Sequence, residues 1–441
     1  MSEYAEFLAG KRVRAESHGF ACDEATLPDC LFHFQRRIVA WAARKGRAAV
    51  FAGCGLGKTL MQLVWAQLVQ RHTGGAVLIL APLAVAAQTV REGAKFGIEC
   101  RVVRSQEDVT GPGIYVTNYE MVDHFDPAHI GAVVLDESSI LKQSDGKTRT
   151  KLIAHFGKVP RRLACTATPA PNDPEELTNH AEFLGVSTRT EMLAAYFVHD
   201  QDGWRLKGHA RRPLFRWMAS WAIALRRPSD MGYDDEGYIL PELHIHTHLI
   251  DVNVVPDGQL FASDLGGVGG RAAVRKATIV DRCNHAAEIV NRESDEPWII
   301  WCGLNDEADM MTRLIPGAVN VHGGWSPEDK ADAMLRFADG EIRVLVTKPS
   351  IASFGLNWQH CARMAFVGLS DSYESYYQSI RRCYRYGQCR EVQAHIVLTA
   401  VESQIAANIS RKQAAAQDVT AGLVTALNEQ REDATWQRTY T

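Results

Sequence analysis

Short apolar runs alternate with longer helical patterns along most of the chain. In the N-terminal part these runs are nearly continuous in valine, isoleucine, leucine and alanine, which is typical of parallel strands covered on both faces. They are AAVFAG (48–53), AVLILAP (76–82), GIYVTN (113–118), AVVLDE (132–137) and RLACTAT (162–168). Because helical patterns lie between most of them, the pattern predicts an α/β fold with a doubly wound parallel sheet.

A second set of apolar runs begins near residue 297 and again predicts a parallel sheet with helical crossovers. The runs are PWIIWCG, AVNVHGG, IRVLVTK, RMAFVG and VQAHIVLT. The stretch from about 190 to 280 breaks this rhythm and carries tryptophans and pairs of arginines. We interpret it as a helical insertion and connector between two α/β lobes.

These patterns divide the chain into successive parts. They are an N-terminal segment (1–29), a first lobe (30–190), the helical insertion and connector (191–280), a second lobe (281–400) and a C-terminal helix with a tail (401–441).

Composition adds constraints on partners and location. The 441 residues are 46% hydrophobic and 23% charged, with a formal net charge of -4, so any basic surface for nucleic acid must be local. The N-terminus is too polar for a signal peptide, and no apolar run reaches the roughly 18 residues that a membrane span needs. The ten cysteines are scattered without a C-x-x-C pair. We therefore expect a cytoplasmic protein without disulfides, structural zinc or a membrane contact.

The run FAGCGLGKT (51–59) is either a phosphate-binding loop or a tight glycine turn. An apolar strand precedes it and a helical pattern follows it directly, which is the context that a phosphate loop requires. Lys58 would then reach the β- and γ-phosphates of ATP, and Thr59 would ligate Mg²⁺. The loop residues that would surround the phosphates are Gly53, Cys54, Gly55, Leu56 and Gly57.

Two further strand ends carry candidate chemistry. LDESS (135–139) ends an apolar run with two carboxylates, so Asp136 would ligate the Mg²⁺ and Glu137 would polarise the attacking water as general base. The alternative is a solvated acidic strand end. In CTATPAPND (165–173), Thr166 and Thr168 could contact this acidic end and a neighbouring lobe, although the isolated string also fits a plain strand-to-turn transition.

The segment YYQSIRRCYRYGQ (376–388) carries two arginines three residues apart. On a helix Arg382 and Arg385 would share a face, and such a pair could neutralise charge on the γ-phosphate as an arginine finger supplied in cis. A solvated basic helix is the alternative. The intact phosphate loop and acidic pair favour the finger.

Taken together, these strings resemble the superfamily-two helicases and translocases, within them the Swi/Snf-like branch, in the same order from about residue 30 to 400. LFHFQRRIVAW (31–41) resembles the adenine-reading segment, with Gln35 as its glutamine. DESS stands where the family has a DExH box, although Ser139 replaces the usual histidine. QSIRRCYRYGQ is similar to the Q-x-x-x-R-x-x-R-x-G-Q motif, which adds Gln378 to the catalytic residues. The surrounding sequence SDSYESYYQSIRRCYRYGQ (370–388) resembles the compact versions of this family that phages and prophages carry.

The resemblance implies two RecA-like P-loop NTPase lobes, with ATP and Mg²⁺ in the cleft and the arginines inserted on closure. Hydrolysis would drive movement along nucleic acid, most simply duplex DNA tracking, with single-stranded DNA as a further DNA partner, in a bacterial or phage-infected cell. The residues expected to contact nucleic acid or couple it to ATP are Thr117, Asn118, Tyr119, Thr166, Thr168, Ser350 and Asn357. The alternatives are an RNA-dependent ATPase and a non-catalytic nucleotide-gated scaffold. A small-molecule kinase is excluded because it would need neither the second lobe nor the distant arginine pair. The sequence does not say whether a protein partner exists.

Two features of the connector have competing interpretations. The insertion's tryptophans and arginines could form a nucleic-acid clamp, but Trp217 and Trp221, four residues apart, fit one helix's core face better. HIHTH (244–248) places three histidines on one face of a strand. A solvated face is favoured over a metal site, because no cysteine or carboxylate cluster accompanies it.

Overall fold

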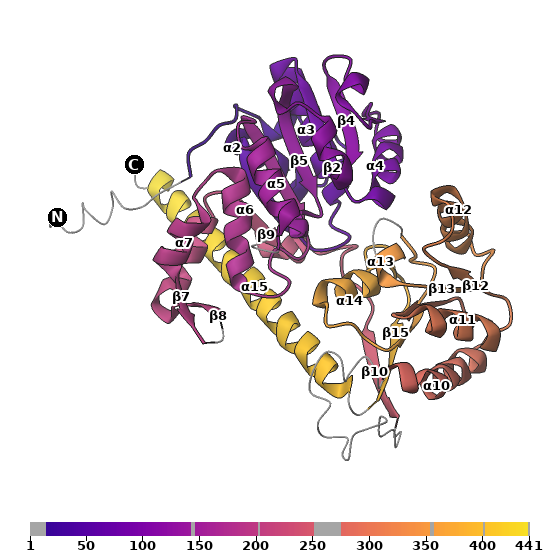
Figure 1. The fold of residues 1–441 in the computed structure, drawn as a ribbon. Helices are drawn as coiled ribbons and strands as arrows, with labels where there is room; N and C mark the ends of the chain where they lie inside the picture. Colours follow the sequence, from indigo (N-terminus) through magenta and orange to yellow (C-terminus); the bar gives the residue numbers. More distant parts are fainter. Residues whose placement is uncertain are drawn as a thin grey trace. The chain divides into compact units, whose positions relative to one another are not determined.

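The computed structural model describes residues 15–142, 146–201, 203–250, 275–352, 357–399 and 402–439. Residues 1–14 of the predicted N-terminal segment and 251–274 at the end of the predicted connector lie outside the described residues. The chain forms two compact units, Met1–Asp235 with Ala414–Thr441, and Glu236–Gln413 (Figure 1). Among the described residues, no helix combines the length and the apolar character that crossing a bilayer requires.

The first unit is built on a seven-stranded parallel sheet with the order β3-β4-β2-β5-β6-β1-β9. Its strands are β1 (Arg47–Ala52), β2 (Ala76–Ala81), β3 (Arg101–Val102), β4 (Gly113–Asn118), β5 (Ile130–Asp136), β6 (Arg161–Thr166) and β9 (Ala222–Leu225). Every residue of β2 is buried, because the strand lies between two neighbours and both of its faces are covered. The continuous apolar runs of the sequence therefore correspond to central strands.

Helices follow the strands in alternation and form two layers over this sheet. One layer holds α2 (His33–Lys45), α3 (Lys58–Thr73) and α4 (Leu83–Lys95), and the other holds α5 (Lys147–Phe156), α6 (Leu177–Leu184) and α7 (Arg189–Tyr196). Short 3-10 turns connect them: η1 (Glu24–Thr26), η2 (Gln106–Asp108), η3 (Tyr119–His124), η4 (Pro127–His129), η5 (Ser138–Leu141), η6 (Pro174–Glu176), η7 (Gly208–Ala210) and η8 (Pro228–Met231).

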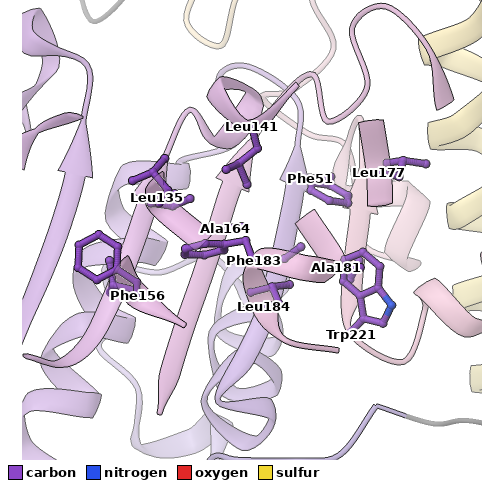
Figure 2. Close-up of a cluster of buried hydrophobic side chains, with 14 of the residues drawn as sticks. Phe51, Leu135, Leu141, Phe156, Ala164, Leu177, Ala181, Phe183, Leu184 and Trp221 are labelled. Atoms are coloured by element: carbon purple, nitrogen blue, oxygen red, sulfur yellow. The ribbon is translucent and has the colours of Figure 1, made fainter. Parts of the chain in front are cut away.

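The main core of the first unit lies between the sheet and the α5–α6 layer (Figure 2). Phe156, Phe183 and Trp221 are its largest fully buried side chains. α8 (Arg211–Met218) and the middle of α15 (Ser403–Thr439) extend this core. They contribute the buried side chains Leu214, Phe215, Met218, Val419, Leu423, Val424 and Ala426. The C-terminal helix is therefore part of the first unit's hydrophobic core.

The second unit contains a six-stranded parallel sheet with the order β10-β15-β14-β11-β13-β12. Its strands are β10 (Leu243–Ile250), β11 (Trp298–Cys302), β12 (Ala318–Val321), β13 (Val344–Thr347), β14 (Arg363–Val367) and β15 (Val392–Thr399). Its helices are α10 (Ile279–Arg292), α11 (Asn305–Leu314), α12 (Pro327–Ala338), α13 (Pro349–Ala352) and α14 (Tyr373–Ile380). Two parallel-sheet α/β lobes confirm the predicted fold class.

The stretch predicted as a helical insertion contains strands as well as helices. β9 pairs with β1 at the edge of the first sheet, and β10 pairs with β15 at the edge of the second. Between α7 and α8, β7 (Phe197–Asp200) and β8 (Gly203–Leu206) form an antiparallel hairpin. Of the edge strands, β10 contains the predicted strand at 244–248, whereas β9 was not predicted, because an edge strand draws its hydrogen bonds from a distant partner.

Candidate active site

The carboxyl ends of three neighbouring parallel strands meet at one edge of the first sheet. β1 leads into the phosphate loop, β5 ends at Asp136 and β6 ends at Thr166. In the strand register Phe51 is opposite Thr166, and Asp136 is opposite Cys165. This edge is where ligands of doubly wound sheets bind, and it brings together the motifs at 51–59, 135–139 and 165–173.

Glycines give the phosphate loop its shape. Gly55 has φ 88° and Gly57 has φ 76°, both in the region that non-glycine residues avoid. Helix α3 begins immediately afterwards at Lys58, so the N–H groups of its first turn and its dipole favour an anion in front of the loop. Leu56 is buried, whereas Cys54 is half-buried.

Gln35 holds this loop from helix α2. Its Nε2 donates to the Leu56 carbonyl at 2.9 Å, and its Oε1 accepts from the Phe32 N–H at 3.0 Å. A Cβ atom on Gly57 would lie 2.3 Å from Gln35 Nε2, so a side chain there would displace Gln35, and the φ of 76° favours glycine as well. The predicted adenine-reading glutamine is therefore placed beside the loop. Adenine reading itself stays a prediction.

The two polar residues at the start of α3 face the same edge. Lys58 Nζ donates to the carbonyls of Ala52 at 2.9 Å and Gly53 at 3.3 Å, which keeps the ammonium over the loop. Thr59 occupies the first turn of α3 and is half-buried. An ammonium and a hydroxyl in these positions suit phosphate oxygens and a hard cation.

Asp136 is buried at the end of β5. Its Oδ1 accepts from Gln62 Nε2 at 2.7 Å and from the Glu137 N–H at 3.1 Å. Burial raises the pKa of Asp136, while the Gln62 hydrogen bond and the Lys58 charge oppose that rise. Gln62 was not predicted from sequence. The available signal was a polar residue one helical turn after Lys58, within the otherwise apolar run 60–66.

Tyr119 also supports the acidic strand end. Its hydroxyl donates to the Asp136 carbonyl at 2.5 Å, and burial raises the pKa of this phenol well above its usual value. Of the predicted nucleic-acid segment at 117–119, Thr117 and Tyr119 are buried and Asn118 is half-buried. The Tyr119 side chain is therefore engaged with the acidic box in this structure.

Glu137 adopts a left-handed backbone conformation with φ 51° and ψ 54°. No other non-glycine residue among those described has a positive φ. Such a conformation costs on the order of 1–3 kcal/mol and is held by surrounding contacts. The Thr166 hydroxyl donates to Glu137 Oε2 at 3.3 Å, and Thr166 Oγ1 accepts from the Thr168 N–H at 3.1 Å. The predicted base and the first threonine of the next motif are thus in direct contact.

A histidine lies beside the acidic box although the box itself has none. His180 Nε2 is 3.1 Å from Ser138 Oγ, and both side chains are buried. Burial lowers the pKa of His180 to about 4, so the imidazole is neutral near pH 7. His180 was not predicted from the sequence, because 42 residues separate it from Ser138. No local pattern linked the two.

In the second unit, the prediction that Arg382 and Arg385 share a helical face is wrong. Helix α14 ends at Ile380, and both arginines lie in the turns that follow. Arg382 is buried and donates to the Gln378 carbonyl at 3.2 Å and to Gln378 Oε1 at 3.1 Å. Arg385 is half-buried. Gln378 therefore orients Arg382.

Ser350 lines a cavity of about 160 Å³ in the second unit. Lys348, Arg275 and Ser375 also line it, so cationic and hydroxyl groups face the same space. Asn357, the other residue predicted to contact nucleic acid in this lobe, is half-buried and does not line the cavity.

The arginines of the proposed clamp form ion pairs on the surface of the first unit, and the clamp itself stays a hypothesis. Arg211 pairs with Asp418 of α15, and both Arg212 and Arg216 pair with Glu429. Trp221 is fully buried in the core, and its ring lies 5.4 Å from that of Trp217. The core interpretation of the two tryptophans is confirmed, although Trp221 lies beyond the end of α8.

The HIHTH histidines lie beside β15, and His246 is exposed while His244 and His248 are half-buried, so the face is at least partly solvated as predicted. His246 Nε2 lies 2.7 Å from Gln393 Oε1, and His248 Nε2 lies 3.0 Å from His395 Nδ1. His244 Nε2 lies 3.4 Å from a carboxylate oxygen of Glu391. Glu242, the second carboxylate near His244, and Glu391 are both exposed, which is common without a bound ion.

Two protein families match the chain in the order of its lobes. A family model described as the SNF2-related domain matches residues 34–197, and one described as the helicase conserved C-terminal domain matches residues 281–387. Together they cover more than half of the chain.

Individual relatives are more distant. The chain is 27% identical over 171 residues to a protein of Mus musculus named DNA annealing helicase and endonuclease ZRANB3, which aligns 35% of this chain but only 16% of the mouse protein. Among solved structures, the chain is similar to the Sulfolobus solfataricus SWI2/SNF2 ATPase core in complex with dsDNA. That match has a TM-score of 0.45 and 16% identity over 92% of this chain and 96% of that one.

Proposed function

Because this chain belongs to the SNF2-related branch of the superfamily-two helicases, whose members are nucleic-acid-dependent ATPases, we propose that it is a translocase that couples ATP hydrolysis to movement along DNA. The observation that carries the proposal is the convergence of Lys58, Asp136, Glu137 and Thr166 at one edge of the first sheet. A nucleotide-gated scaffold without turnover has no need for both a phosphate-binding lysine and a positioned carboxylate base.

Each of these groups has a distinct task in hydrolysis. Lys58 binds the β- and γ-phosphates as a cation. Glu137 accepts a proton from the attacking water, and its carboxylate is oriented by the Thr166 hydroxyl. Gln35 holds the loop that receives the phosphates through its contact with Leu56. In-line attack needs positioning above all, so these supporting contacts matter as much as the charged groups.

The residues fit a Mg²⁺ ion. Asp136 presents a buried carboxylate at the carboxyl edge of the first sheet, and Thr59 presents a hydroxyl from the first turn of α3, which are oxygen ligands of the kind that Mg²⁺ prefers. When bound with the nucleotide, the ion neutralises charge on the phosphate oxygens. Gln62 fixes the orientation of the Asp136 carboxylate, as expected for a residue that supports a metal ligand.

Arg382 and Arg385 are proposed to complete the site from the second lobe as the arginine finger. Arg382 is buried and its guanidinium is bonded to Gln378, so we assign it to holding the turn in place. The half-buried Arg385 is then the better candidate for contact with the phosphate.

DNA is the proposed polymer, with RNA as the alternative. The mouse relative is named a DNA annealing helicase, which favours DNA. The cavity beside Ser350 and Lys348 is a candidate phosphate contact of the second lobe. Contacts of this kind read the backbone, so binding should weaken with salt and depend little on sequence. A compact phage or prophage type in a bacterial cytoplasm is supported by the resemblance of residues 370–388 alone.

The test is the steady-state ATPase rate of the intact chain without polymer and with single-stranded DNA, duplex DNA and RNA, each at two salt concentrations. Strong stimulation by duplex DNA is expected. Stimulation by RNA alone would select the RNA-dependent alternative. Absence of turnover under every condition, together with intact ATP binding, would indicate the scaffold. Lys58→Ala serves as the control for contaminating ATPases.

A further inference from the structure

The backbone around Glu137 is fixed by buried hydrogen bonds on both sides. Tyr119 binds the carbonyl of the preceding residue, Asp136, at 2.5 Å. His180 binds the hydroxyl of the following residue, Ser138, at 3.1 Å. Between them Glu137 holds its left-handed conformation, with φ 51°. A residue held in a sparsely populated conformation keeps it only while its neighbours are fixed.

His180 belongs to α6, which contacts the acidic box at more than one point. The adjacent residue, Asn179, donates from Nδ2 to the carbonyl of Leu141 at 2.8 Å and to that of Lys142 at 3.4 Å. These carbonyls belong to the turn that directly follows the box. One helix therefore fixes both the start and the end of η5.

The imidazole also contacts the strand that leads to the phosphate loop. Its ring meets Phe51 edge-on, with centroids 5.2 Å apart and an interplanar angle of 84°. Figure 2 shows Phe51 beside the helix that carries Leu177 and Ala181. His180 thus touches β1 through Phe51 and the acidic box through Ser138. A movement of α6 would therefore displace the contacts with both Phe51 and Ser138.

We propose that His180 is a positioning residue for Glu137: through Ser138 it holds the general base in its left-handed conformation and links it to α6. This inference rests on the proposed ATPase function. It assigns no contact with ATP or water to the imidazole. Loss of the hydrogen bond should therefore lower turnover without weakening nucleotide binding.

The test compares His180→Phe with a matched control in the intact chain. Phenylalanine keeps the ring and its edge contact but removes the hydrogen bond. The control is His155→Phe, because His155 also hydrogen-bonds, from Nε2 to the Phe125 carbonyl at 2.8 Å, and meets Phe156 edge-on at 4.8 Å. His155 lies on α5, outside the acidic box. A merely structural role would give the two variants similar effects.

For His180→Phe we expect kcat to fall on the order of 10- to 100-fold, as for small misplacements of catalytic groups, with the Kd of a fluorescent ATP analogue within about twofold. Hydrogen exchange of the amides at 137–142 should become faster. Ser138→Ala should reproduce the effect, and the double variant should be no worse than either single one, because both remove the same bond. His180→Gln, which can still bond Ser138, should retain most of the turnover.

Equal kcat values in His180→Phe and His155→Phe, or unchanged kcat in Ser138→Ala, would overturn the inference and leave the proposed function intact. A parallel loss of nucleotide affinity would also overturn it, because it would place His180 in the binding site. Absence of turnover from the unsubstituted chain would refute the proposed function and this inference together. If His180→Phe fails to fold, Ser138→Ala still decides the question.

Discussion

The Thr166 hydroxyl donates a hydrogen bond to the Glu137 carboxylate across 3.3 Å, between the ends of neighbouring strands β6 and β5. This contact joins the two motifs that follow the phosphate loop. It orients a carboxylate whose backbone is already held in a left-handed conformation. The proposed base is therefore constrained at its side chain and at its main chain.

Replacing Glu137 with glutamine should separate binding from turnover. Glutamine keeps the size of the side chain but cannot accept a proton from water, so kcat should fall on the order of 10²- to 10⁴-fold while ATP binding persists. Lys58→Ala should instead weaken ATP binding, because it removes the phosphate-binding cation. Equilibrium binding and steady-state ATPase assays measure the two effects. Normal hydrolysis by Glu137→Gln would refute the assignment of the base.

Removing the Thr166 hydroxyl should impair turnover through Glu137. Thr166→Val preserves shape but loses the hydrogen bond, and we expect kcat to drop roughly tenfold, a typical effect of about 1.4 kcal/mol on the barrier. Thr166→Ser keeps the hydroxyl and should stay near the unsubstituted rate. If valine and serine at this position give equal kcat values, the contact has no catalytic role.

The two arginines after α14 should differ in what they affect. Arg385→Ala should lower DNA-stimulated kcat by up to about 10³-fold with little change in the unfolding temperature, as expected for a finger. Arg382→Ala should lower both kcat and the unfolding temperature, because Arg382 is buried against Gln378. Arg381 provides the control in the same turn, since its guanidinium lies over the rings of Tyr377 and Tyr384. ATPase assays and thermal denaturation would be read side by side. An unchanged kcat in Arg385→Ala would contradict the assignment.

Helix α15 should stabilise the first unit through apolar contacts rather than ion pairs. Leu423 is fully buried in the core shared with α8, so Leu423→Ala should cost about 2–5 kcal/mol of unfolding free energy. Arg211→Ala breaks an exposed pair with Asp418 and should cost at most about 1 kcal/mol. Chemical denaturation of the intact chain measures both. The reverse ranking would show that the ion pairs dominate.

Stability of the second unit should decline in mild acid partly because of His395. Burial, followed by His246 and His248 of β10, lowers the pKa of His395 to about 4; Arg363 of β14 and His285 of α10 act in the same direction. Between pH 6.5 and about 4 the unfolded chain binds a proton at this residue that the folded chain does not. The free energy of unfolding should therefore fall as the pH falls through this window. The free energy of unfolding, measured by denaturation at several pH values, should change less steeply with pH in His395→Gln than in the unsubstituted chain. Identical pH dependence in the two proteins would exclude the effect.

The sequence by itself determined the elements that depend on local pattern. Continuous apolar runs predicted central parallel strands, because a strand covered on both faces is apolar at every position. The order strand, glycine loop, helix predicted the phosphate loop, since Gly55 and Gly57 provide the positive φ values that the turn needs. The carboxylates of Asp136 and Glu137 could be placed at a strand end because they directly follow an apolar run in the sequence.

Only the tertiary structure decided how these groups are supported. Gln62 on Asp136, Thr166 on Glu137 and His180 on Ser138 join residues from separate elements, and no spacing in the sequence records such hydrogen bonds. The turn after α14, the edge strand β9 and the pairing of β10 with β15 were likewise not predicted. Local propensity is weak there, and partners distant in the chain supply the hydrogen bonds that fix the backbone. The identity of the chemical groups is a local property of the chain, whereas their orientation depends on how the layers pack.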